Sequence, residues 1–362
     1  MADLEKALPE NEKDTFSAKC ENCGANMVFN PETQELYCSY CGSSKDFEKS
    51  KEVSEIRIAE ALSKTVLWDE ENVSYKCENC GAVVVMPSTQ VATICPYCST
   101  SHVVKTIDSC GLKPNAIYPF TLTKQEAVTY AKTWAKKRFF APGKFKKGLQ
   151  VDSFKGVYEP AFTYDTNTYS TYEGVIGITR TRTTGSGKNR RTYTYTDWRS
   201  ISGTFSYFFD DVTITASDTN TQTTLNAILP YDVNDIKTYD KSYLSGFMAH
   251  QTEKSVSTGW EEAKETIKSS LRSLILSRYV YDKVRYLNVY TNHENVTYKY
   301  VLLPIYMLNF PYKQKQYPVY VNGNTGKVSG KTPISPWKVA LVTLLGVGLA
   351  ALLIWLFMTY GA

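Results

Sequence analysis

Cys20–Ala25 reads CENCGA, and the same six residues return at Cys77–Ala82. In each copy, 14 residues separate the second cysteine from another Cys-x-x-Cys pair. The second set is the first displaced by 57 positions at all four cysteines, so this part of the chain is an internal duplication. The two quartets are Cys20, Cys23, Cys38 and Cys41, and Cys77, Cys80, Cys95 and Cys98.

This spacing is typical of zinc-binding modules. A Cys-x-x-Cys turn points two thiolates at one ion, and a short hairpin brings the second pair to the same ion. Four thiolates close the tetrahedral site to water, so the ion is structural and supplies folding free energy to a small module. We therefore predict two tandem four-cysteine zinc ribbons, residues 15–46 and 73–106, each with one structural Zn²⁺. Glycine after a knuckle (Gly24, Gly42, Gly81) permits a positive φ.

Two alternatives remain for these cysteines. In the first, they form disulfides or stay free thiols. In the second, His102 replaces one thiolate as a metal ligand. Paired cysteines in a cytosolic protein are more often metal ligands than disulfides. Cys110, the ninth cysteine, has no spacing partner.

The ribbon hairpins and the segment between them are also expected from local pattern. A helix is predicted in the linker, residues 47–72, because Val53, Ile56 and Leu62 give a partial helical stripe. The hairpin strands are expected near Asn26–Phe29, Glu35–Tyr37, Ala82–Met86 and Val91–Ile94.

Residues 115–330 are predicted to form one α+β body. The 27 tyrosines and many threonines favour strands. One helix is expected from Thr123 to Phe140, with Thr123 and Glu126 in a capping box, and another from Thr258 to Arg278, with Glu261 as capping partner. Short connections favour mainly antiparallel pairing. The strands are expected near Val157–Tyr164, Thr168–Arg182, Arg191–Tyr207, Val284–Thr291, Val296–Leu303, Ile305–Tyr312 and Tyr317–Val321.

The run Val339–Met358 has no charged residue and is long enough to cross a hydrocarbon core of roughly 30 Å. We predict a transmembrane helix at 339–358. Lys327, Lys331 and Lys338 precede it and no Lys or Arg follows, which favours a cytosolic body. The acidic N-terminus lacks the pattern of a secretory signal. We therefore expect a single-pass protein of the cytoplasmic membrane with its N-terminal body in the cytosol.

Two basic stretches each allow two interpretations. The first, within 132–147, is either a solvated surface or a patch that binds anionic lipids or phosphates. The second, around the turn 185–189, is a nucleic-acid-binding ribbon or a charged edge that resists aggregation. The first contains Lys132, Lys136, Lys137, Arg138, Lys144, Lys146 and Lys147, and the second contains Arg180, Arg182, Arg190, Arg191 and Arg199.

Catalytic motifs are not visible in the sequence. The Gly-Lys pairs at 187–188 and 326–327 lack the spacing of a phosphate-binding loop. None of His102, His250 and His293 lies in a zinc-protease or hydrolase motif. The pair Asp210-Asp211 has no partner motif. We expect no enzymatic activity and no small-molecule substrate.

The chain resembles the bacterial transcription-factor-IIB-type zinc-ribbon membrane proteins, which often carry primosomal or replication-helicase-like labels. The resemblance rests on the paired ribbons and on Ile117–Ala127, Phe139–Lys146, Gly156–Phe162, Leu229–Asp235, Leu302–Phe310 and Val321–Pro333. It implies a membrane protein. Some relatives are encoded beside phage-shock-like and SPFH-type proteins, which implies a role in envelope stress. The helicase label has no support because the chain lacks a nucleotide-binding loop.

The expected function is a non-enzymatic membrane-anchored adapter that recruits cytosolic or membrane-associated proteins to the bilayer. The alternative is a membrane-tethered nucleic-acid-binding protein acting in replication or transcription. The mild net charge of +5 decides neither.

Overall fold

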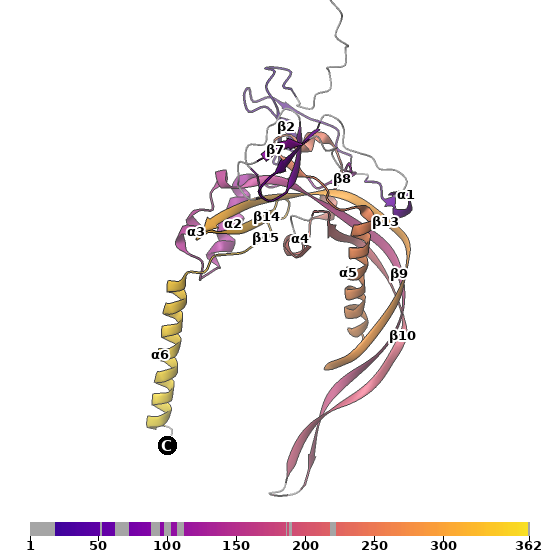
Figure 1. Ribbon diagram of the computed structural model, residues 1–362, viewed down its shortest axis with the longest axis vertical. Coiled ribbons are helices and arrows are strands. Elements are labelled where there is room, and N and C mark those ends of the chain that lie inside the picture. Colours follow the sequence, from indigo (N-terminus) through magenta and orange to yellow (C-terminus); the bar gives the residue numbers. More distant parts are fainter. Residues whose placement is uncertain are drawn as a thin grey trace, which may run out of the picture.

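The computed structural model describes residues 19–50, 53–61, 72–87, 95–97, 103–106, 112–185, 187, 190–217 and 222–360. It is a mixed α+β protein dominated by one large, mainly antiparallel sheet. Figure 1 shows three very long strands of this sheet bending together into an arch. They are β9 (Lys155–Thr184), β10 (Arg191–Thr215) and β13 (Lys283–Tyr312).

The order of strands in the large sheet explains how distant segments come together. β9 lies between β13 and β10 along most of its length, antiparallel to both. Short strands complete the sheet, and two pairings are parallel, β12 with β9 and β8 with β13. These short strands are β4 (Ile56–Arg57), β5 (Asn72–Cys77), β6 (Val83–Pro87), β7 (Val103–Thr106), β8 (Ala116–Ile117), β11 (Lys237–Thr238), β12 (Met248–His250), β14 (Lys315–Asn322) and β15 (Val328–Gly330).

Helix α5 (Val256–Leu276) covers the inside of the arch (Figure 1). Its buried positions recur at helical spacing, with Ala263, Ile267 and Leu271 on one face. Ile267 and Leu271 pack against apolar residues of all three long strands, Tyr172 and Ile176, Ile201, Phe205 and Phe209, and Leu287, whereas Ala263 belongs to the main core. Other short helical elements are α4 (Gln222–Ile228) and the 3₁₀ turns Val151–Ser153, Val233–Asp235 and Lys241–Leu244.

The base of the body carries α2 (Lys124–Lys136), α3 (Gly143–Lys147) and the C-terminal helix α6 (Pro336–Tyr360). The expected capping box of α2 is confirmed, because Thr123 and Glu126 cap each other's backbone N–H groups. Helix α6 extends away from the body (Figure 1). No residue is buried in the most apolar stretch of Pro336–Thr359. Among the described residues it is the one helix long and apolar enough to span a membrane.

A small second sheet is formed by β1 (Val28–Asn30), β2 (Glu35–Tyr37) and β3 (Ser44–Lys45). Its first two strands confirm the hairpin expected for the first module. The second module is built differently, because β5, β6 and β7 are strands of the large sheet. Residues 73–106 and the body at 115–330 therefore share one sheet. The strand expected at Val91–Ile94 lies outside the described residues.

Several predictions about local structure were wrong. The described part of the linker is mostly non-helical, since only α1 (Ile58–Ala61) is helical there. Ile56–Arg57, just before α1, pair with β13, and Val53 packs against the apolar cluster that contains Ala116, Tyr118 and Tyr231. Tertiary contacts thus override a weak helical stripe. Helix α2 ends at Lys136, before Phe140, and α5 is capped by Ser255, whose side chain accepts from the N–H of Thr258.

The strands expected separately within Lys283–Tyr312 form one strand. Register shifts between Val284 and Tyr286 and between Glu294 and Thr297 interrupt its pairing with β9. Asn295 lies at φ 53°, a left-handed conformation that marks the second irregularity. These irregularities let one continuous strand follow the arch.

Candidate metal centre

The three cysteine knuckles that are fully described share one backbone design. In each, the N–H of the glycine donates to the carbonyl of the knuckle's first cysteine at 2.8–2.9 Å. The N–H of that cysteine donates forward, to Ala25, Ser43 or Ala82, at 2.8–2.9 Å. These bonds close a tight loop that aims both sulfurs of a knuckle the same way. Gly24, Gly42 and Gly81 have φ of 73°, 77° and 80°, so the expected left-handed turn is confirmed.

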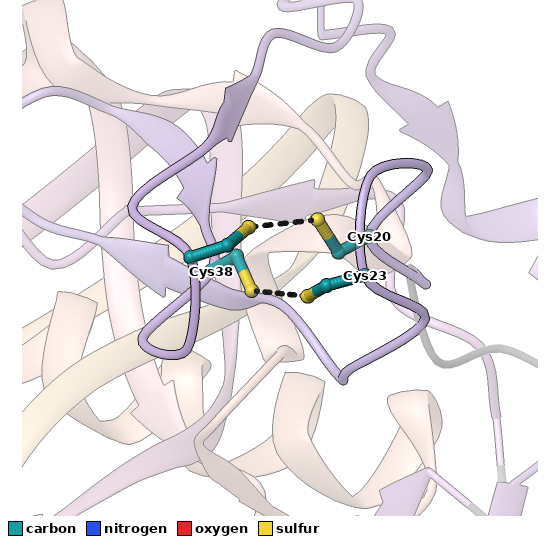
Figure 2. A group of neighbouring side chains, drawn as sticks. Cys20, Cys23 and Cys38 are labelled. Carbon is teal, nitrogen blue, oxygen red and sulfur yellow. Dashed lines mark hydrogen bonds between the residues drawn. The ribbon is translucent and has the colours of Figure 1, made fainter.

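The first cluster brings its four cysteines together from two loops. Cys20 Sγ lies 3.4 Å from Cys41 Sγ, and Cys23 Sγ lies 3.5 Å from Cys38 Sγ. All four sulfurs lie within 4.8 Å of one another. Figure 2 shows the sulfurs of Cys20 and Cys23 on one loop directed toward the loop of Cys38.

These distances suit a shared ion. Four thiolates at about 2.3 Å from one tetrahedral ion are about 3.8 Å from one another. A disulfide requires about 2.05 Å, and the described cysteines form none. The first cysteine of each knuckle is buried and the second is exposed, so one side of the cluster faces solvent.

The second cluster has the same form. Cys77, Cys80 and Cys95 also lie within 4.8 Å of one another, and Cys80 Sγ is 3.7 Å from Cys95 Sγ. Cys98, the predicted fourth ligand, lies outside the described residues, as do His102 and Cys110. The structure thus brings together seven of the eight predicted ligands in two groups able to hold metal ions.

The thiols of the first cluster differ in acidity. The hydroxyl and backbone N–H of Ser43, together with Cys20, lower the pKa of Cys41 to about 6. The backbone N–H of Ala25 lowers the pKa of Cys23, but the sulfurs of Cys38 and Cys41 outweigh it and raise it to about 12. One thiolate therefore forms readily at neutral pH, and a cation would stabilise the remaining thiolates.

The first module docks on the body through an aromatic contact. Phe29 packs edge-on against Tyr243, with ring centroids 5.2 Å apart, and its N–H donates to Ser245. Gln34, at φ 58°, donates from its side chain to the carbonyl of Phe120 at 2.8 Å. The module is thus packed against the main core and is not a free appendage.

The second module docks through a buried polar cluster that sequence reasoning missed. Tyr97 lies between Cys95 and Cys98, and its hydroxyl donates to Glu159 at 2.8 Å. The other carboxylate oxygen of Glu159 lies 3.2 Å from Nδ1 of His250, and Nε2 of His250 lies 3.7 Å from Glu253. Tyr97, Glu159 and His250 are all nearly inaccessible to solvent. No motif joins residues this far apart in sequence.

Electrostatics favour a charged pair within this cluster. Burial lowers the pKa of His250, but the carboxylates of Glu159 and Glu253 outweigh it and raise that pKa to about 9. Burial and the negative charge of Glu159 raise the pKa of Tyr97 well above its usual value, so Tyr97 remains a neutral donor.

A third group of acids, Asp165, Asp210 and Asp211, also lies within metal-binding distance. Lys299 already supplies a cation there, because its Nζ lies 3.1 Å from Asp165 and 2.8 Å from Asp211. Glu55, from the linker, lies 3.3 Å from the same nitrogen. This group is an ion network that connects β9, β10, β13 and the residue just before β4. Asp211 of the predicted pair therefore belongs to a structural network, and Asp210 is exposed beside it.

These features define a class of protein: a mixed α+β protein with large antiparallel pairings, two cysteine clusters able to hold metal ions, and one apolar C-terminal helix. The chain is 31% identical over 327 residues to YdjG of Bacillus subtilis (strain 168), an uncharacterized protein. The similarity covers 90% of this chain and 92% of that relative, so the chain belongs to the YdjG family. No protein-family model and no solved structure matches the chain. The resemblance to the transcription-factor-IIB-type proteins therefore stays a prediction.

Proposed function

We propose that this protein is a non-enzymatic adapter that holds cytosolic or membrane-associated proteins at the cytoplasmic face of the membrane. The observation that carries the proposal is the position of its parts. The first cysteine module lies at the top of the arch, and α6 runs downward from the left foot of the arch, away from that module (Figure 1). A body anchored by α6 thus presents its metal-organised surface away from the bilayer. A role in envelope stress rests on the family resemblance alone.

Each cysteine cluster holds one structural Zn²⁺ in this proposal, which makes residues 15–46 and 73–106 tandem zinc ribbons. Four sulfur donors with tetrahedral spacing suit zinc and leave no position for a substrate. The ion stiffens the loops at the module's tip, and a rigid surface loses less conformational entropy when a partner binds.

The tip of the first module offers a specific contact residue. Tyr40 lies between Cys38 and Cys41 and is 87% exposed. Tyrosine is one of the residue types enriched at binding hot spots, and the knuckle holds this one in solvent. Substitution of Tyr40 leaves the four cysteines in place. It therefore tests whether the module contacts a partner without disturbing the fold of the module.

The test is affinity purification of the full-length protein from solubilised membranes, with zinc measured in the same sample. We expect two zinc ions per chain and a recurring protein partner. Tyr40→Ala should keep both ions but lose the partner, whereas Cys38→Ser should lose one ion and the partner and still fractionate with membranes. A wild type without zinc, or equal partner recovery by all three proteins, would contradict the proposal.

A second candidate function is nucleic-acid binding by the β9–β10 hairpin. Tyr193 and Tyr195 are exposed beside the arginines of its tip, and base stacking on aromatic rings next to basic groups is a common mode of single-strand binding. This function requires retention of DNA or RNA that weakens steeply as salt rises. No retention at low salt would remove it.

A further inference from the structure

The loop between α2 and α3 is attached to the start of α6. Lys338, in the first turn of α6, donates from Nζ to the carbonyls of Phe139 and Ala141, each at 2.9 Å. The N–H of Ser335 donates to the carbonyl of Phe140 at 2.9 Å. These bonds fix the loop at the point where α6 leaves the body.

The same loop exposes apolar side chains although a core lies next to it. Phe139 and Phe140 are 59% and 41% exposed, and beside them Ile334 and Trp337 are 63% and 75% exposed. Phe145, only five residues after Phe140, is completely buried and packs edge-on against Phe310 at 5.2 Å. The loop is thus held by a buried aromatic anchor while its tip remains in solvent.

The charge around this tip has one sign. Between Ala127 and Val151 the sequence contains seven basic residues and no acid, and no acid occurs after Lys331. Four of these basic residues, Lys136, Lys137, Arg138 and Lys144, are exposed and lie within five residues of the aromatic pair in the sequence. We call the loop 137–143, these lysines, Ile334 and Trp337 the basal surface.

We propose that the basal surface binds anionic phospholipid headgroups, with Phe139 and Phe140 entering the interfacial layer beside Trp337. Exposed aromatic rings flanked by lysines suit this layer, where the ring meets the acyl boundary and the ammonium groups meet lipid phosphates. The body would then be held at two points, by the transmembrane helix α6 and by contact of loop 137–143 with lipid headgroups. Two points of attachment set the orientation of the body on the bilayer. The proposal rests on the membrane anchoring proposed above.

The tip of the β9–β10 hairpin is the competing basic surface. The described ends of β9 and β10 run in the same downward direction as α6 (Figure 1), and Arg182, Arg190 and Arg191 there are exposed. The basal surface is favoured because hydrogen bonds join it to α6, which fixes its distance from the bilayer. The hairpin offers a matched control, since three exposed basic residues can be neutralised at each site and the same charge is then removed.

The experiment uses the full-length protein in two preparations. In nanodiscs of phosphatidylcholine with or without phosphatidylglycerol, hydrogen exchange is followed in peptides covering 137–143. In a neutral detergent, native mass spectrometry measures how strongly each lipid is retained. We compare the wild type, the variant Lys136→Gln/Lys137→Gln/Lys144→Gln, and the control Arg182→Gln/Arg190→Gln/Arg191→Gln.

We expect phosphatidylglycerol to slow exchange in 137–143 and to be retained in preference to phosphatidylcholine. Neutralising the three lysines should abolish the slowing and weaken the preference by about fivefold per lysine, on the order of 100-fold in all. The arginine control should behave as the wild type. Phe139→Ser/Phe140→Ser should reduce the protection and leave the preference for the anionic lipid.

Three outcomes would overturn the proposal: equal exchange in both lipids, equal losses in the two charge variants, or protection of 137–143 by a single-stranded oligonucleotide in place of lipid. A protein that never enters the discs would refute membrane anchoring as well. If the wild type shows no lipid preference but still recovers its protein partner, the lipid proposal fails and the adapter role stands. If it prefers the anionic lipid but recovers no partner, the adapter role fails and the lipid proposal stands.

Discussion

At the scale of single residues, the knuckle glycines are required for their backbone conformation. Gly81 lies at φ 80°, and a Cβ built on it would meet no atom within 4 Å. The cost of Gly81→Ala is therefore that of a left-handed residue, about 1–2 kcal/mol, without any steric clash. We expect a lower unfolding temperature and faster release of the second ion to a chelating dye.

Gly143→Ala is the control for this prediction. Gly143 has equally open space and no positive φ, at the start of α3. Alanine favours helix over glycine, so the control should leave stability unchanged or slightly higher. Similar destabilisation by the two substitutions would contradict the conformational argument.

His250 makes the stability of the protein depend on pH. Its pKa is about 9 in the folded protein and near 6.5 in an unfolded chain. The charged His250–Glu159 pair therefore contributes fully below pH 6.5, and its contribution, about 3 kcal/mol at most, is lost as pH rises through 9. Thermal unfolding between pH 6 and 9.5 should show this loss in the wild type and a flatter profile in His250→Gln. His293→Gln, a half-buried histidine whose pKa is lowered, should retain the wild-type profile.

At the scale of elements, Lys299 of β13 joins β9, β10 and the linker through ion pairs with Asp165, Asp211 and Glu55. Lys299→Met would leave Asp165, which is 3% exposed, without its cation. Removing one partner of a buried ion network typically costs about 3–5 kcal/mol. Urea unfolding should show this loss, and Lys268→Met, at an exposed helix pair, should change stability by less than about 1 kcal/mol. Equal effects would mean that the network adds nothing beyond surface pairing.

Elements with strong local signals were predictable from sequence, and elements built by distant contacts were not. The knuckles, the β1–β2 hairpin, the Thr123 cap and the apolar tail follow from spacing and composition. The linker was misread because Glu55 and Ile56 take their structure from Lys299 and β13, more than 240 residues away. The Tyr97–Glu159–His250 cluster was missed for the same reason. Pairing partners in a sheet are set by tertiary packing, which periodicity does not reveal.

At the scale of the whole molecule, the two cysteine modules are attached in different ways. The first forms its own sheet and contacts the body through side chains such as Phe29 and a few hydrogen bonds. The second shares the large sheet, where Val85 of β6 pairs with Ala249 of β12. Loss of metal from the second module should therefore spread further into the fold.

We predict that Cys77→Ser/Cys80→Ser lowers the unfolding temperature more than Cys20→Ser/Cys23→Ser, by at least about 5 °C, because a few kcal/mol of sheet contacts are lost in addition. Hydrogen exchange should rise in β5, β6 and β12 in the first variant, but only in 19–47 and its contacts at Tyr243 in the second. Each variant should bind one ion fewer, and a chelator should remove the difference between them. If both double variants lower the unfolding temperature equally, and hydrogen exchange rises only within the substituted module, the cysteine modules and the arch fold independently.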